Sequence, residues 1–158
     1  MTHDTAGHER FRLPGWIRAW VYAGGTLCAA SGALWLLFHY FIHRNGAFGP
    51  EPHPMEHAWL VVHGIAGLGM LWVFGLVWLP HVRRGWAKRQ HRLAGGTMVS
   101  LMLWLAISAG GLYYLGNDDW RDVVGVAHWA SGLFAAAWLP THIWLGRRTI
   151  RRRARARD

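Results

Sequence analysis

The sequence predicts an all-α protein, a transmembrane four-helix bundle with both termini in the cytoplasm. Of its 158 residues, 53% are hydrophobic and only 16% are charged. Four stretches contain no Asp, Glu, Lys or Arg, and each is longer than the ~20 residues with which a helix crosses ~30 Å of hydrocarbon. These stretches are 19–42, 58–82, 93–117 and 123–146. A single membrane domain of residues 1–158 is therefore expected, with no independent soluble unit.

The placement of basic residues predicts how the bundle is oriented. All but two of the 17 Lys and Arg residues precede the first helix, join the second to the third, or follow the fourth. The exceptions, Arg44 and Arg121, lie in the opposite loops, which hold most of the acidic residues. The positive-inside rule then predicts a multi-pass membrane protein with both termini in the cytoplasm. The arginine-rich segment 147–158 is expected to be a cytoplasmic tail on anionic lipid headgroups, with no nucleic-acid partner.

The elements follow in order along the chain. The first helix, 16–42, starts like a signal peptide, but its apolar run is too long for a signal core, so a permanent helix is expected. The outer loop 44–56 contains a proline-bearing stretch at 49–54 that should resist helix and lie across the outer surface. The second helix, 57–82, should kink at Pro80. The third and fourth helices, 92–116 and 122–146, are joined by a short acidic loop.

The two halves of the chain share short motifs. Each half would be an up-down helix pair in the same orientation, which places equivalent residues of helices two and four at equal depth. Chance similarity among glycine-rich apolar segments is the alternative explanation. The motifs are Gly-Gly-Thr at 24–26 and 95–97, His-x-x-x-Gly-Leu at 63–68 and 128–133, and Trp-Leu-Pro at 78–80 and 138–140.

Four histidines are candidate axial ligands of two haem irons. His128 and His142 are 14 residues apart, which is ~1400° and ~21 Å along a helix, so they share a face at two depths. His63 and His81 are 18 residues apart, five full turns and ~27 Å, so they share a face with ~6 Å more between them. Helix tilt and the kink at Pro80 are expected to absorb this difference. We expect His63 to pair with His128 at an outer haem, and His81 with His142 at an inner one.

Two axial imidazoles leave no open position on a haem iron, so such a site carries electrons and does not activate oxygen. Cys28 is the only cysteine, which excludes a Cys-x-x-Cys-His site for covalent haem. The expected cofactors are therefore two non-covalent haem b groups. Small residues beside the candidate ligands, including Gly64, Gly67 and Gly132, would let helix backbones approach a flat macrocycle.

Each histidine also has another possible use. A histidine in a membrane helix can bond a neighbouring helix or relay a proton, and His81, at the inner edge, can simply reach toward water. His91 is the alternative to His81 at the inner haem. His39 and His43, near the outer end of helix one, are alternative outer ligands or contacts for haem propionates or a quinone. Finally, His53 and His57 form a weaker candidate for metal capture from outside.

The chain resembles the small four-helix diheme b-type membrane cytochromes of prokaryotes, which are similar to formate dehydrogenase gamma subunits and nickel-iron hydrogenase cytochrome b subunits. The resemblance covers about 16–148 and rests on the spacing of His128 and His142, on His63, and on Ser-Ala-Gly-Gly-Leu-Tyr-Tyr at 108–114. In the formate dehydrogenase relatives, the inner haem takes one ligand from helix one. The inner half of helix one here, 16–30, has no histidine, so His81 is the expected substitute.

The resemblance implies a subunit of the bacterial inner membrane that transfers electrons across that membrane between the quinone pool and a redox partner, expected to be periplasmic. Such partners include a multihaem c-type cytochrome, an iron-sulfur protein or a flavin protein. The chain is expected to be a non-catalytic part of an oxidoreductase complex, with any enzyme activity in its partners. Two alternatives stay open: a haem-free transporter that relays protons through histidines, and a structural membrane anchor subunit.

Overall fold

The chain folds into four long helices, as predicted. The computed structural model describes residues 13–87, 89 and 92–155. Helix α1 is Gly15–Tyr40, α2 is Pro54–Val77, α4 is Arg92–Tyr114 and α5 is Asp118–Arg155. All four are long and apolar enough to cross a membrane, so the prediction of an all-α transmembrane bundle is confirmed.

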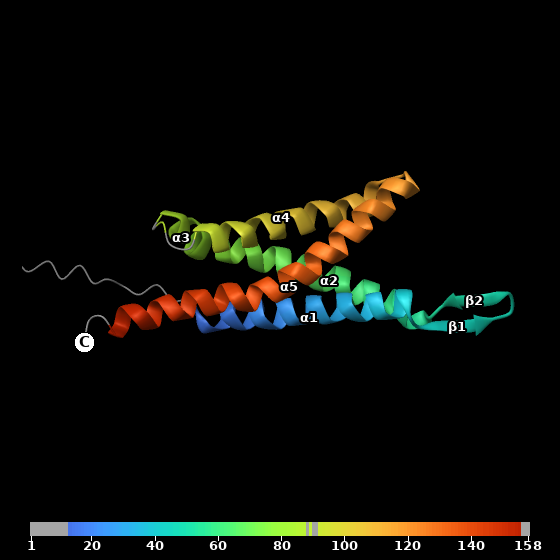
Figure 1. The fold of residues 1–158 in the computed structure, drawn as a ribbon, viewed down its shortest axis with the longest axis horizontal. Helices are drawn as coiled ribbons and strands as arrows, with labels where there is room; N and C mark the ends of the chain where they lie inside the picture. The colour runs from blue at the N-terminus through green and yellow to red at the C-terminus, as the bar shows by residue number, and fades with distance from the viewer. Residues whose placement is uncertain (1–12, 88, 90–91, 156–158) are drawn as a thin grey trace, which may run out of the picture.

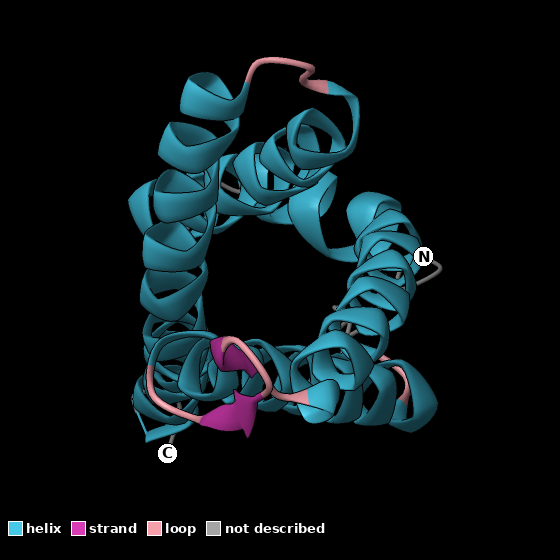
Figure 2. Ribbon diagram, turned by 90° about the vertical axis from the view of Figure 1, so that its right-hand side faces the viewer, coloured by secondary structure: helices cyan, strands magenta, loops and turns pink. Residues whose placement is uncertain are grey.

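The bundle consists of two antiparallel helix hairpins. Helix α1 packs along α2, and α4 packs along α5 (Figure 1). Contact between the hairpins comes mainly from α5, which starts beside α4 and ends beside α1. There Arg147 Nη2 donates a hydrogen bond to Tyr22 Oη at 3.1 Å, and Gly25 lies against Leu139. Seen end on, the helices form a ring (Figure 2).

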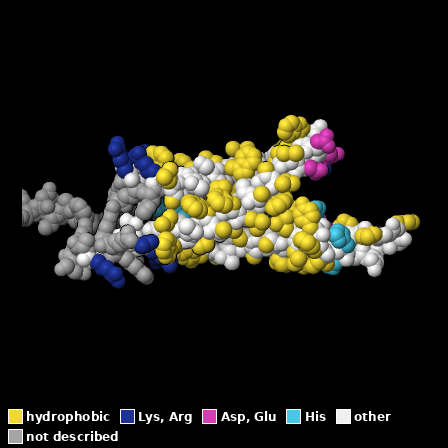
Figure 3. All heavy atoms as spheres, in the orientation of Figure 1, with side chains coloured by type: hydrophobic (Ala, Val, Ile, Leu, Met, Phe, Trp, Pro, Cys, Tyr) yellow, Lys and Arg dark blue, Asp and Glu magenta, His cyan; other side chains and the backbone are white. Residues whose placement is uncertain are grey.

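The two ends of the bundle carry opposite charge. Most of the described Arg side chains gather at one end and the Asp and Glu side chains at the other, where Arg44 and Arg121 pair with carboxylates, and a largely hydrophobic surface lies between the two ends (Figure 3). We call these the basic end and the acidic end. Large side chains such as Ile65 and Leu68 are exposed on this apolar surface, where they face lipid in a membrane. Which end faces the cytoplasm stays a prediction.

Among the described residues, small side chains form most of the buried core. This lets helix backbones approach closely, as is common in membrane bundles, where apolar burial gives little driving force between helices. The buried apolar residues are Ile17, Ala66, Val73, Ala94 and Ala135, and the buried polar ones are Ser31 and Ser108.

The outer loop forms two strands that were not predicted from the sequence. Strands β1, His43–Gly46, and β2, Gly49–Pro52, form an antiparallel hairpin at the acidic end. Gly49 adopts a positive φ of 125°, which only glycine takes up without strain, at the turn. Arg44 and Glu51 are cross-strand partners joined by an ion pair of 2.8 Å. Prolines are tolerated here because a two-stranded ribbon has only edge strands.

Two helices extend beyond their predicted ends. Helix α5 continues through Arg155, so most of the predicted tail 147–158 is helical; arginine is a strong helix former and no Gly or Pro interrupts it after Gly146. After α2, the chain opens into a π-helix over Trp78–Arg83 and then forms α3, Arg84–Ala87, inside the predicted inner loop. The distortion expected at Pro80 is therefore present, as a wide helical turn.

Candidate functional site

The structure brings the four predicted histidines together in the two predicted pairs. His63 on α2 faces His128 on α5, with ring centres 6.3 Å apart and ring planes at 86°. His81 in the π-helical segment faces His142 on α5, with ring centres 6.0 Å apart and planes at 89°. Both pairs join the first hairpin to the second, across the ring of helices seen in Figure 2.

The separation of the rings fits an iron held between two imidazoles. A bond from a metal to an imidazole nitrogen is about 2 Å, and each nitrogen lies about 1.1 Å from its ring centre, so two ligands of one metal have centres roughly 6 Å apart. The observed values of 6.3 and 6.0 Å match this in both pairs. The donor set is also suitable, since paired imidazoles are ligands of electron-carrying haem.

Hydrogen bonds determine the orientation of His63. Its Nδ1 lies 2.9 Å from the backbone carbonyl oxygen of Cys28 on α1. A carbonyl only accepts, so Nδ1 must carry the proton. The Ser31 hydroxyl lies 3.4 Å from the same nitrogen. Gly32 provides room for the ring, because a Cβ there would lie 2.9 Å from His63 Cε1.

His128 is oriented in a similar way from the other hairpin. Its Nδ1 lies 2.8 Å from Ser108 Oγ on α4. The Ser108 hydroxyl also lies 2.8 Å from the carbonyl of Trp104, which can only accept. With the single hydroxyl proton in that bond, the Ser108 oxygen accepts from His128, and Nδ1 of His128 carries the proton as well.

Both outer histidines are thus fixed with Nδ1 as the donor, which leaves Nε2 of the neutral ring as a bare electron pair. Metal-ligating histidines typically show this arrangement, in which the second nitrogen donates to a carbonyl or hydroxyl that fixes tautomer and orientation. The described buried polar side chains, Ser31 and Ser108, are both beside these rings.

The contacts of these serines with the histidines were not predicted from the sequence, although Ser108 begins the motif at 108–114. A serine inside a charge-free helix is a weak signal, since its hydroxyl usually bonds its own helix four residues back. Ser31 and Ser108 both do so, to Leu27 and Trp104. That they also face the histidines follows only from the packing of the helices.

The inner pair meets despite the unequal spacings of its helices. His81 lies within the π-helix, next to Pro80, whose missing N–H cannot join the helical hydrogen-bond ladder. A π-turn changes both the rise and the rotation of the helix locally, and such turns are common at functional sites. Proline is also present at position 140, but α5 stays α-helical there. The π-turn therefore moves His81 from the position that a regular α-helix would give it, and both pairs meet despite the ~6 Å difference expected from the sequence.

The other described histidines lie elsewhere. At the acidic end, His39 bonds Glu56 and His43 lies in β1, so neither takes the place of His63 or His128 in the outer pair. His53 Nδ1 accepts the backbone N–H of Met55 and caps α2. His91 lies outside the described residues. Within residues 13–87, 89 and 92–155, no group of three or more His, Cys, Asp or Glu is placed to hold a metal ion.

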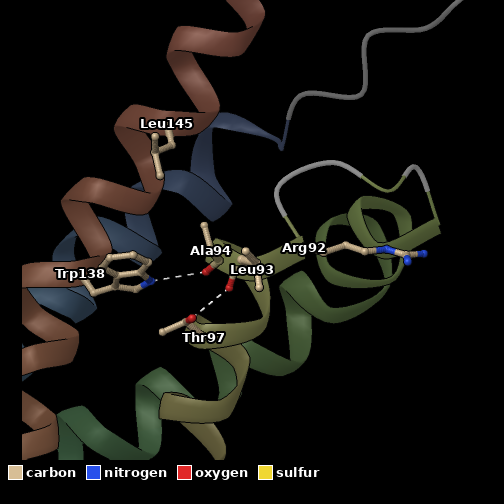
Figure 4. A pocket seen from close by; sticks show the side chains of 6 residues that line it. All are labelled: Arg92, Leu93, Ala94, Thr97, Trp138 and Leu145. Atoms are coloured by element: carbon tan, nitrogen blue, oxygen red, sulfur yellow. Dashed lines mark hydrogen bonds between the residues drawn. The ribbon is translucent and has the colours of Figure 1, made fainter.

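Two clefts open on the bundle. One, of about 450 Å³, lies between α4 and α5 at the basic end (Figure 4). Its polar groups are engaged within the protein: Trp138 Nε1 donates to the Ala94 carbonyl at 3.4 Å, and Thr97 Oγ1 donates to the Leu93 carbonyl at 2.9 Å. Arg92 points away from it in Figure 4 and bonds the Trp86 carbonyl. The other cleft, of about 290 Å³, lies at the acidic end between α1 and α2.

Comparisons with protein-family models, with curated proteins and with solved structures return no match to this chain. Its function is therefore inferred from its own residues.

Proposed function

We propose that this chain is a diheme cytochrome b subunit of a bacterial inner-membrane oxidoreductase complex, which carries electrons across the membrane between the quinone pool and a redox partner. The single observation that carries the proposal is the pair of facing imidazole couples, at 6.3 and 6.0 Å between ring centres. His63 and His128 would hold one haem b, and His81 and His142 the other. A periplasmic partner stays a prediction from the resemblance.

The spacing of the couples supports a transmembrane role. His128 and His142 are 14 residues apart on the same helix, a rise of ~21 Å, which is most of the ~30 Å hydrocarbon thickness. Helix α5 alone therefore sets two depths in the bilayer. In a membrane the long apolar helices would surround the outer pair with lipid and protein, whereas His81 of the inner pair is exposed at the end of the second span.

The residues of this chain have positioning and tuning roles. The carbonyl of Cys28 and the hydroxyl of Ser108 each hold one outer imidazole in the tautomer that offers Nε2. When bound, haem supplies reversible one-electron chemistry at iron. Hydrogen bonds at Nδ1 make an imidazole a stronger electron donor, so these contacts tune the ligand as well as orient it.

Single substitutions test the assignment through their pattern. His63→Leu and His128→Leu should each remove the same haem from the reduced-minus-oxidised spectrum of the purified protein, while His81→Leu and His142→Leu remove the other. His43→Leu, in the exposed strand β1, is the matched control and should remove neither. If substitutions of the two histidines of one pair removed different haems, the proposed ligation would be contradicted. A wild-type spectrum without haem bands would favour the relay transporter or the structural anchor.

A further inference from the structure

The cleft at the acidic end combines an aromatic wall with ionisable side chains. It lies between the end of α1 and the start of α2, beside the strand hairpin, where histidine side chains are visible in Figure 3. Its volume of about 290 Å³ fits one small ring system rather than a long chain. The residues that bear on its chemistry are Trp35, His53, Glu56, His57 and Leu60.

An imidazole and a carboxylate form a proton-accepting pair at this cleft. His39 Nδ1 lies 2.7 Å from Glu56 Oε1, and the Glu56 side chain is only 18% exposed. The His39 ring also stacks on Trp35, with ring centres 4.7 Å apart and planes at 18°. The pair is therefore held in place, and its carboxylate is an acceptor for a ligand hydroxyl.

A hydrogen-bond donor stands beside this acceptor. His53 Nδ1 accepts from Met55 N–H, so the proton of a neutral His53 ring is on Nε2, which makes that nitrogen a donor. Leu60, on the membrane side of the cleft, is 48% exposed, so the cleft opens toward lipid. A flat aromatic ring with polar groups and an apolar tail fits these features. An anionic lipid headgroup does not, because the Glu56 carboxylate repels phosphate.

The cleft belongs to the same helix interface as the outer histidine pair. Glu56, Leu60 and His63 follow one another on α2 at intervals of four and three residues, so they form one stripe about 10 Å long. Gly32 and His39 mark the facing stripe on α1, where Gly32 touches the His63 ring and His39 bonds Glu56.

We propose that this cleft binds the aromatic head group of a quinol, with a ring hydroxyl donating to Glu56 and the isoprenoid tail leaving over Leu60. The inference rests on the proposed function, in which the chain meets the quinone pool. The quinol would then bind at the acidic end of the bundle, within about 10 Å of His63 along α2.

Photolabelling tests the site without any measurement of electron transfer. A benzoquinol carrying a photoreactive azide and a short isoprenoid tail is irradiated with the purified full-length protein in detergent, and the label is located by mass spectrometry. Label should appear within residues 35–60 and be displaced by unlabelled quinol. Glu56→Gln should weaken the apparent affinity about tenfold, since it replaces a charge-assisted hydrogen bond with a neutral one that is roughly half as strong.

Glu51→Gln is the matched control, since Glu51 is a carboxylate at the same end that pairs with Arg44 and does not line the cleft. It should leave labelling unchanged. Equal labelling of wild type and Glu56→Gln, or label concentrated near Trp138 at the basic end, would overturn the inference. The haem spectrum of the same wild-type sample separates the two proposals. If haem is present but the cleft is not labelled, only the quinol site is rejected. If the cleft is labelled but haem is absent, only the proposed cytochrome function is rejected.

Discussion

Replacing Gly32 by alanine should remove the outer haem and leave the bundle folded. A Cβ at position 32 would lie 2.9 Å from His63 Cε1 and 3.0 Å from its Nδ1. Ordinary van der Waals contact is about 3.5–4 Å, so the ring must move by at least half an ångström. Because the ring is held at 2.9 Å from the Cys28 carbonyl, this movement breaks or lengthens its hydrogen bond.

The energies suggest a local effect. A buried donor left without its acceptor costs about 1–3 kcal/mol. Alanine in place of glycine within a helix returns roughly 0.5–1 kcal/mol. The net change is small against the stability of a folded domain, about 5–15 kcal/mol, so the helices should persist. Binding sites, however, tolerate displacements of only about 0.5 Å, so haem affinity at the outer site should fall at least about tenfold.

Haem content per chain measures the effect. Purified Gly32→Ala should contain one haem b instead of two, with the remaining bands those of the inner site. Gly69→Ala is the control, because Gly69 is exposed on α2 and a Cβ there would meet nothing within 4 Å. A Gly32→Ala protein with two haems and the wild-type spectrum would refute the placement of His63 as an iron ligand.

Three further predictions concern the same pairs. Ser108→Ala leaves Nδ1–H of His128 without its acceptor and makes the imidazole a poorer electron donor to iron. In a redox titration, the midpoint potential of the outer haem should therefore rise by about 40 mV for each kcal/mol of hydrogen-bond energy lost. Ser108→Thr, which keeps the hydroxyl, should partly restore the potential. The ring planes of each pair are nearly perpendicular, at 86° and 89°, so the two imidazoles would leave the iron orbitals with which they interact almost equal in energy. The ferric protein should therefore give strongly anisotropic low-spin EPR signals. Two rhombic signals typical of parallel rings would contradict the geometry. Pro80→Ala should favour an ordinary α-helix, shift His81, and lower inner but not outer haem occupancy; equal loss of both haems would count against this.

The fold could be predicted from the sequence because a bilayer limits the possibilities so strongly. Stretches without charge that exceed ~20 residues have few structures open to them other than a spanning helix. Outside the bilayer this constraint is lost. The strand hairpin at 43–52 depends on one glycine turn and one cross-strand ion pair, and the helical extension to Arg155 depends on local propensity, so neither followed from the hydropathy pattern.

The pairing of the histidines was predicted from helical periodicity and from the motifs that the two halves share, and the resemblance added His81 as the substitute for a ligand from helix one. Residues that share a face on each of two helices must meet if those faces turn inward, and the observed pairs do so. The contacts of Ser108 and of the Cys28 carbonyl could not be predicted, because they depend on which turn of one helix lies beside which turn of its neighbour. The π-turn at Pro80 was expected only as a kink.

The most direct test of the account is the haem b content of the purified full-length protein, from its reduced-minus-oxidised absorbance spectrum and the protein concentration. The two imidazole couples predict two haem b groups per chain, each with the spectrum of six-coordinate iron. A protein that is folded and helical but shows no haem bands after expression with ample haem would contradict the account.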